Sequence, residues 1–181
     1  MFISEIVTHG VMGFKKTSDT IAVSFGVPES AANTFTEEEI SLQLDVLNNE
    51  IFVVLAIDLN LTPPDAIAAT DTAIGGSVTS TAAPTAALQN LSNTNCLATA
   101  RDFIRAGGFV DSGVGFSRAA LETYDADLDY IGLIATNNFF VQVIGTNNAV
   151  AKGVEGRVWG YRAKADASTY AALVQSEVLS A

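Results

Sequence analysis

The residues that could do chemistry are few, and one of them lies in the segment FVDSG, residues 109–113. Two apolar residues followed by Asp-Ser-Gly have the form of the aspartic-protease signature. Such a site needs two carboxylates that share one proton, so a single copy predicts a homodimer in which two Asp111 side chains meet across a two-fold axis. Asp, Ser and Gly are also the usual residues of a tight turn. The sequence favours the turn, because the tripeptide is common.

Three more carboxylates alternate along DADLD, at Asp125, Asp127 and Asp129. The segment resembles the opening of a calcium-binding loop, but Tyr130 stands where the sixth loop position needs Gly, and Thr136 where the twelfth needs Glu. An EF-hand is therefore excluded. On a strand the three acids would line one face. They then form either a solvated edge that discourages wrong strand pairing, which we favour, or a cation site between subunits.

Other chemistry has little support in the sequence. A single histidine, His9, argues against a histidine-based metal site or a Ser-His-Asp triad, and a single cysteine, Cys96, excludes a disulfide within the chain. The glycine-rich segment GGFVDSGVG matches neither the phosphate-binding loop nor the dinucleotide-binding pattern. We therefore expect no cofactor and no enzymatic activity.

The overall charge restricts the class of partner. Twenty acidic and nine basic residues give a net charge of −11 and a pI near 4.2, which argues against direct binding of nucleic acid. Charged residues make up 16% of the chain, against about 25% in ordinary domains, so much of the surface must be neutral. An acidic pI with few lysines is also a feature of proteins from high-salt environments. The first residues lack the basic region and unbroken apolar core of a signal peptide.

Alternating hydrophobicity predicts several β-strands. The segments 20–27 and 73–83 are short candidates bounded by Gly or Pro. Residues 40–46 and 51–61 predict a hairpin that turns at Asn48-Asn49, with its second strand buried on both faces between Ile51 and Ile57. Residues 139–144 and 158–164 predict two further strands, joined by the turn-like segment 145–148.

Helical patterns are fewer. The segment 93–108 has a cap candidate in Thr94 or Asn95 and a stop at Gly107, which predicts a short helix. The segment 166–180 fits a helix that begins after Asp166 or Ser168, although period two fits it almost as well. Many short strands and long Gly-, Asn- and Thr-rich connections favour an all-β fold: one antiparallel β-sandwich over residues 1–181, a single jelly roll of about eight strands with one or two short helices.

The stretch FFVQVIG, residues 139–145, is apolar on both faces. In a two-layer sandwich only one face of a strand meets the core of its own chain. Phe139 is in phase with Val141 and Val143, so we expect it to face the core, whereas Phe140 and Gln142 are expected at a contact with a neighbouring subunit. Two aromatic residues of the next strand, Trp159 and Tyr161, are the other candidates for this interface. For the aromatic cluster as a whole the sequence favours packing within the core, and a contact between subunits is the functional alternative.

The whole chain resembles the small single-jelly-roll major capsid proteins of icosahedral archaeal viruses with an internal membrane, especially those that infect haloarchaea. The resemblance rests on length, low pI, the lack of a signal peptide, and the segments LDYIGLIATNNFFVQVIG and GRVWGYRAKADASTYAALVQSE. It implies a virion structural protein, made in the host cytoplasm, that self-assembles into upright pseudo-hexameric capsomers. Its partners would be further copies of itself, a second capsid protein and, indirectly, the viral membrane.

Two other classes remain open. A β-rich surface adhesin or filament subunit would share the neutral surface, although the missing signal peptide disfavours it. The homodimeric aspartic protease through Asp111 is the third.

Overall fold

The computed structural model describes residues 13–108, 115–119 and 128–179, and for residues 115–119 it describes only the backbone. This part of the chain is mainly strand. The elements in chain order are β1 (Phe14–Lys16), β2 (Ile21–Pro28), β3 (Thr36–Ser41), a 3₁₀ turn η1 (Val46–Asn48), β4 (Glu50–Leu61), β5 (Thr72–Thr79), β6 (Cys96–Arg105), β7 (Gly115–Ala119), β8 (Gly132–Ile134), β9 (Asn138–Thr146), β10 (Gly153–Ala165) and α1 (Ala167–Leu179).

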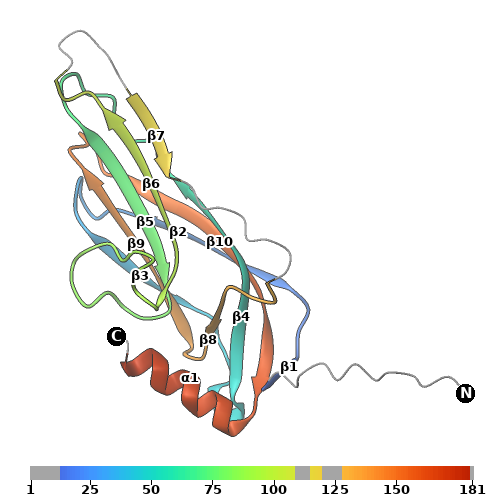
Figure 1. The fold of residues 1–181 in the computed structure, drawn as a ribbon. Helices are drawn as coiled ribbons and strands as arrows, with labels where there is room; N and C mark the ends of the chain where they lie inside the picture. The colour runs from blue at the N-terminus through green and yellow to red at the C-terminus, as the bar shows by residue number, and fades with distance from the viewer. Residues whose placement is uncertain (1–12, 109–114, 120–127, 180–181) are drawn as a thin grey trace, which may run out of the picture.

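The strands form two sheets whose pairings are all antiparallel (Figure 1). In the first sheet, β10 pairs on one side with β4, which in turn pairs with β8. On its other side β10 pairs with β2 over its first half and with β1 near its end. The second sheet has the order β3-β9-β5-β6-β7.

The connectivity is that of a jelly roll. With β1 and β7 set aside, the first sheet runs β2-β10-β4-β8 and the second runs β3-β9-β5-β6. The chain therefore begins by alternating between sheets, and its last strand returns to lie beside its first, as two interlocked Greek keys require. The expected all-β antiparallel sandwich with a single jelly roll is confirmed.

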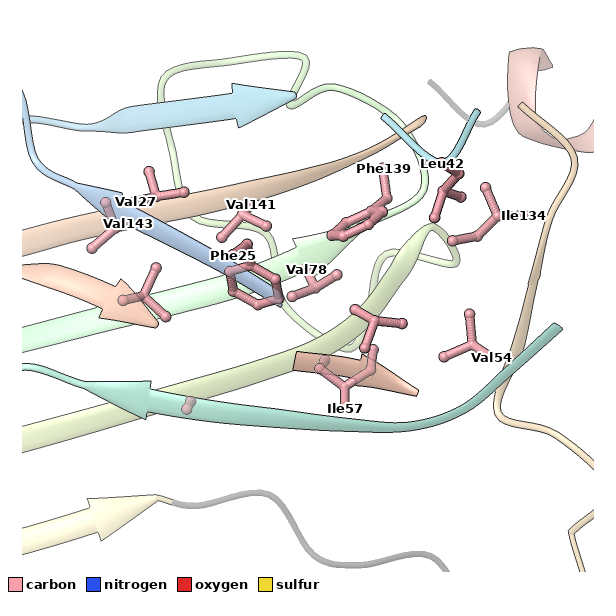
Figure 2. Close-up of a cluster of buried hydrophobic side chains, with 14 of the residues drawn as sticks. Phe25, Val27, Leu42, Val54, Ile57, Val78, Ile134, Phe139, Val141 and Val143 are labelled. Carbon is pink, nitrogen blue, oxygen red and sulfur yellow. The ribbon is translucent and has the colours of Figure 1, made fainter. Parts of the chain in front are cut away.

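The core lies between the inner faces of the two sheets (Figure 2). Phe25 and Val27 of β2 meet Phe139, Val141 and Val143 of β9, all of them buried. The expectation that Phe139 faces the core is thus confirmed. The second strand of the predicted hairpin is also buried on both faces at its start, over residues 51–54.

The predicted hairpin between residues 40 and 61 is wrong. β3 ends at Ser41 and pairs with β9 in the second sheet, while β4 belongs to the first sheet. The connecting residues cross from one sheet to the other, and Leu42 and Leu44 are buried on the way. The alternating pattern identified Leu42 and Leu44 as buried but not Val46, which is exposed. Alternation along one segment cannot distinguish a partner strand in the same sheet from one in the opposite sheet.

The predicted helix at 93–108 is also wrong, because these residues form β6. This strand pairs with β5 on one side and β7 on the other, which satisfies its backbone groups without a helix. Ala98, Ala100 and Asp102 are buried at period two. Helix-forming residues thus adopt the extended conformation because tertiary pairing outweighs a weak local preference.

The C-terminal segment, for which the sequence left helix and strand open, forms the helix α1. The Asp166 carboxylate caps it by accepting hydrogen bonds from the backbone N–H of Thr169 (2.7 Å) and the hydroxyl of Ser168 (2.7 Å). The Ser168 bond and then the Thr169 bond are the main reasons that the pKa of Asp166 is lowered. In Figure 1 the helix lies across the end of the sandwich near β1 and β8.

Candidate interaction surfaces

The residues with predicted chemistry lie mostly outside the part of the chain that the structure describes. This holds for Asp111, Asp125 and Asp127, so the protease and the cation site stay predictions. Asp129 is exposed just before β8. Within residues 13–108 and 128–179, no group of three or more His, Cys, Asp or Glu side chains is placed to hold a metal ion.

The chain's own segment 80–95 covers part of the outer face of the second sheet. Gln142 of β9 is fully buried beneath this segment. Its amide oxygen accepts hydrogen bonds from the Ser77 hydroxyl (2.7 Å) and the backbone N–H of Gln89 (3.1 Å). Its amide nitrogen donates to Glu37 (2.9 Å) and to the Thr79 hydroxyl (3.1 Å). One side chain thus holds three strands and a long connection together.

The interface role expected for Gln142 therefore requires correction. The outward orientation from period two is right, but in this structure the side chain contacts its own chain and offers no surface to a neighbour. Its neighbour Phe140 points the same way and is half-buried, between Glu39 of β3 and Thr79 of β5. Whether Phe140 meets another subunit stays a prediction.

Trp159 lies on the outer face of the first sheet, at a distance from the two phenylalanines. Its indole N–H donates to the Asp58 carboxylate of β4 at 2.9 Å. The guanidinium of Arg157 lies over the indole, 5.4 Å from the ring centroid. In register with Trp159 stand only small residues, Ala22 on β2 and Ala56 on β4. The ring is thereby fixed by two polar neighbours among small residues and remains partly exposed, an arrangement suited to contact with another surface.

A depression of about 460 Å³ adjoins this patch. Polar side chains from three strands line it. There is open space beside Gly26, because the nearest atom to an added Cβ there would be the Glu155 Cγ, at 3.9 Å. Such a site can receive a polar side chain or loop from a partner. The polar lining residues are Ser24, Asp58, Asn60, Glu155 and Arg157.

Tyr161 also lies on the outer face of the first sheet, but nearer to α1. It packs against a second, smaller apolar cluster that joins β4 and β10 to the helix, and the ammonium of Lys16 lies 4.6 Å from its ring centroid. Burial is the main reason that the pKa of Tyr161 is raised, with smaller contributions from Asp129 and Tyr130. Tyr161 thus makes its contacts within its own chain, and the interface role expected for it stays a prediction.

The helix α1 is fixed to the sandwich by a buried carboxylate. Glu177 is 6% exposed, and its two oxygens accept hydrogen bonds from the backbone N–H groups of Ala135 (3.0 Å) and Thr136 (3.2 Å), between β8 and β9. Burial raises the pKa of Glu177, and these hydrogen bonds oppose the rise. The Tyr170 hydroxyl donates to the carbonyl of Ala135 at 3.3 Å. The helix therefore covers one end of the first sheet's outer face.

A polar network fixes the connections at one end of the sandwich. Glu29 is buried and accepts hydrogen bonds from the backbone N–H groups of Gly145 (2.5 Å) and Lys152 (2.8 Å). The Lys152 ammonium forms an ion pair with Asp65 (2.5 Å), and the Asn148 side chain accepts a hydrogen bond from the Asp65 backbone N–H (2.9 Å). The Lys152 hydrogen bond is the main reason that the pKa of Asp65 is lowered. These contacts bind together three connections: β2–β3, β4–β5 and β9–β10.

The sequence did not predict the hydrogen bonds around Gln142 or the polar network of Glu29, Lys152 and Asp65. Gln142, Glu29 and Lys152 are polar residues in otherwise ordinary strand and turn contexts, and their partners lie up to 123 positions away in the chain. Only Gln142 carried a signal, as a lone amide among the apolar residues of β9.

In the described part of the chain, no helix is long and apolar enough to cross a membrane.

Comparison with known proteins adds little. No protein-family model matches the chain, and no curated protein matches it. One solved structure is similar: a chain of Desmodium yellow mottle tymovirus, with 10% sequence identity over 83% of this chain and 91% of that chain and a TM-score of 0.28. A likeness at that score supports no conclusion about this chain, so the following proposals rest on its own residues.

Proposed function

We propose that this protein is a virion structural protein, a capsid subunit that self-assembles into capsomers of an icosahedral shell. The observation that carries the proposal is the outer face of the first sheet, where Trp159 is partly exposed between Ala22 and Ala56. Large aromatic side chains on an otherwise small-residue surface concentrate contact energy when a partner covers them. The resemblance of the sequence to jelly-roll capsid proteins of archaeal internal-membrane viruses adds to it.

The rigidity of the subunit supports the same proposal. A subunit that packs into a shell must present its contact surfaces in fixed positions, because ordering of loops on binding opposes association. The network of Glu29, Lys152 and Asp65 holds one end of the sandwich, and Gln142 holds the 80–95 segment against the second sheet. Long connections that would otherwise be mobile are thus attached to the body of the domain before assembly.

The partners that we propose are further copies of this chain, together with a second capsid protein, and the location is the virion. The net charge of −11 makes contact between copies sensitive to salt, since repulsion between exposed acids is screened more strongly as the Debye length falls from about 10 Å at 0.1 M to about 3 Å at 1 M. We also propose that the protein has no enzymatic activity and does not bind nucleic acid directly.

Negative-stain microscopy and analytical ultracentrifugation of the purified protein test this function. We expect ring-like or shell-like assemblies whose fraction rises with salt between about 0.1 and 1 M. Trp159→Ala should reduce assembly and leave the monomer folded. Leu47→Ala is the matched control: it truncates an apolar residue that is 92% exposed, in η1, and should leave assembly unchanged.

Three results would contradict the proposal. A chain that stays monomeric at every salt and protein concentration is not a self-assembling subunit. Linear fibres in place of closed particles would favour the adhesin or filament class. Cleavage of peptides at acidic pH by the wild type, lost in Asp111→Asn, would favour the homodimeric protease.

A further inference from the structure

The free edge of β2 offers regularly spaced backbone groups to a partner. The Glu29 N–H donates to the Lys152 carbonyl, and the Arg162 carbonyl accepts from the N–H groups of Thr17 and Ser18. The even-numbered residues along β10 therefore direct their backbone groups toward β1 and β2. Because hydrogen-bonded and non-hydrogen-bonded pairs alternate in an antiparallel ladder, the odd-numbered residues of β2 bond to β10. The N–H and C=O groups of Ala22, Ser24 and Gly26 point away from β10, and in the described part of the chain no strand pairs with them.

This edge lacks the features that usually protect a strand from pairing. One edge of the second sheet, β3, carries three consecutive glutamates, Glu37 to Glu39, and the far edge of the first sheet, β8, has only three residues. Charge and shortness both discourage a second strand. β2 has eight residues, IAVSFGVP, and none is charged. Only Pro28, at its end, lacks an N–H that could pair.

We propose that β2 pairs antiparallel with β2 of a second copy of this chain, about a two-fold axis that passes between the two Ser24 residues. In this register Ser24 faces Ser24 of the second copy, and Ala22 faces its Gly26. The outward N–H and C=O groups of all three residues then find partners in both copies. The two first sheets join into one continuous sheet across the axis.

The side chains fit a second copy of the chain. The outer face of β2 carries Ala22, Ser24 and Gly26, all small and exposed, and Pro28 at its end, so the central parts of two such strands can approach without a clash. Beside them on β10 stand Glu155, in register with Gly26, and Arg157, in register with Ser24. In the joined sheet the two β10 strands are separated by both copies of β2, about 14 Å across three strand spacings, so these charged side chains do not meet at the axis. In a chain of net charge −11, an uncharged strand is where two copies can meet with least repulsion.

This inference does not rest on the capsid role. A two-fold strand pair could exist in a subunit of any class, and a shell could assemble without it. A dimer without larger assemblies would support the strand pairing and contradict the capsid proposal. Larger assemblies that do not need β2 would do the reverse.

Single cysteines test the register directly. In a Cys96→Ser background, Ser24→Cys should form a disulfide-linked dimer under mild oxidation, because facing hydrogen-bonded residues have Cα atoms about 5.5 Å apart, within the range a disulfide spans. Ala22→Cys is the matched control, since in this register the two Ala22 residues lie about 14 Å apart along the strands and should remain unlinked. Non-reducing electrophoresis reads out both variants. No dimer with Ser24→Cys, or equal amounts with both variants, would overturn the proposal.

A charge at the axis tests the energetics. Ser24→Glu places a carboxylate beside Arg157 of its own chain, which keeps the fold, and opposite the same carboxylate of the second copy. Like charges directly opposite destabilise a strand pair, so the dimer dissociation constant measured by ultracentrifugation should rise roughly fivefold. Ser41→Glu, the control, adds the same charge at the exposed end of β3 and should leave the constant unchanged. Equal effects of the two variants, or a wild type that never dimerises, would overturn the proposal.

Discussion

Phe25 of β2 and Phe139 of β9 pack edge to face across the sandwich, with ring centroids 6.0 Å apart and an angle of 71° between the planes. They join β2 of the first sheet to β9 of the second (Figure 2). Phe139 is completely buried, so Phe139→Ala should lower the free energy of unfolding by roughly 3–5 kcal/mol. Phe140→Ala, at a half-buried position on the opposite face, should cost clearly less. Denaturant titrations of the two variants measure the difference, and equal losses would contradict it.

Glycine at position 156 is required by the close approach of Phe25. Gly156 and Phe25 stand in register on neighbouring strands, and a Cβ on Gly156 would overlap the carbonyl oxygen of Asp58 and lie 2.5 Å from the Phe25 ring. Gly156→Ala should therefore lower stability by about 1–3 kcal/mol. Gly26→Ala, on the open outer face, is the control and should change the melting temperature little. Tolerance of alanine at both positions would show that the Phe25 ring can move aside.

The buried amide of Gln142 should be necessary for the covering segment. Gln142→Ala removes the common partner of Ser77, Thr79, Glu37 and the Gln89 backbone. Buried polar groups left unsatisfied cost roughly 1–3 kcal/mol, and the amide of Gln89 should exchange its hydrogen faster. Gln175→Ala, exposed on α1, should change stability by less than about 0.5 kcal/mol. Unchanged exchange at Gln89 in Gln142→Ala would mean that other contacts hold the segment.

The anchor of α1 should respond to pH. Burial raises the pKa of Glu177 above its usual value of 4.5, so the folded state holds this proton more tightly than the unfolded state. The contribution of Glu177 to stability is then fully present below the unfolded pKa and is lost as the pH rises through the raised folded pKa. Glu177→Gln removes this dependence, and its stability relative to the wild type should improve from pH 4 to pH 7. Urea titrations at the two pH values measure it, and a constant difference between the proteins would contradict it.

Helix anchoring can be separated from ionisation by a second variant. Glu177→Ala leaves the N–H groups of Ala135 and Thr136 without their side-chain partner and should destabilise the protein at both pH values. The near-ultraviolet circular dichroism of Tyr170, whose hydroxyl bonds to the Ala135 carbonyl, should weaken as the helix detaches. An unchanged signal would indicate that the apolar contacts of α1 suffice.

The sequence by itself determined the all-β class, most of the strands and the inward face of β9, because burial on one side of a strand leaves a period-two pattern that is local in the chain. It offered Trp159 as a candidate for an interface, beside packing within the core, and did not decide between the two. The tertiary structure decided which strands are neighbours. Residues 40–61 became two strands in different sheets, and 93–108 became β6, because the partners of a strand are chosen by contacts far apart in sequence. For the same reason, only the folded chain reveals that Gln142 lies beneath its own segment 80–95, and that β2 keeps an uncharged free edge.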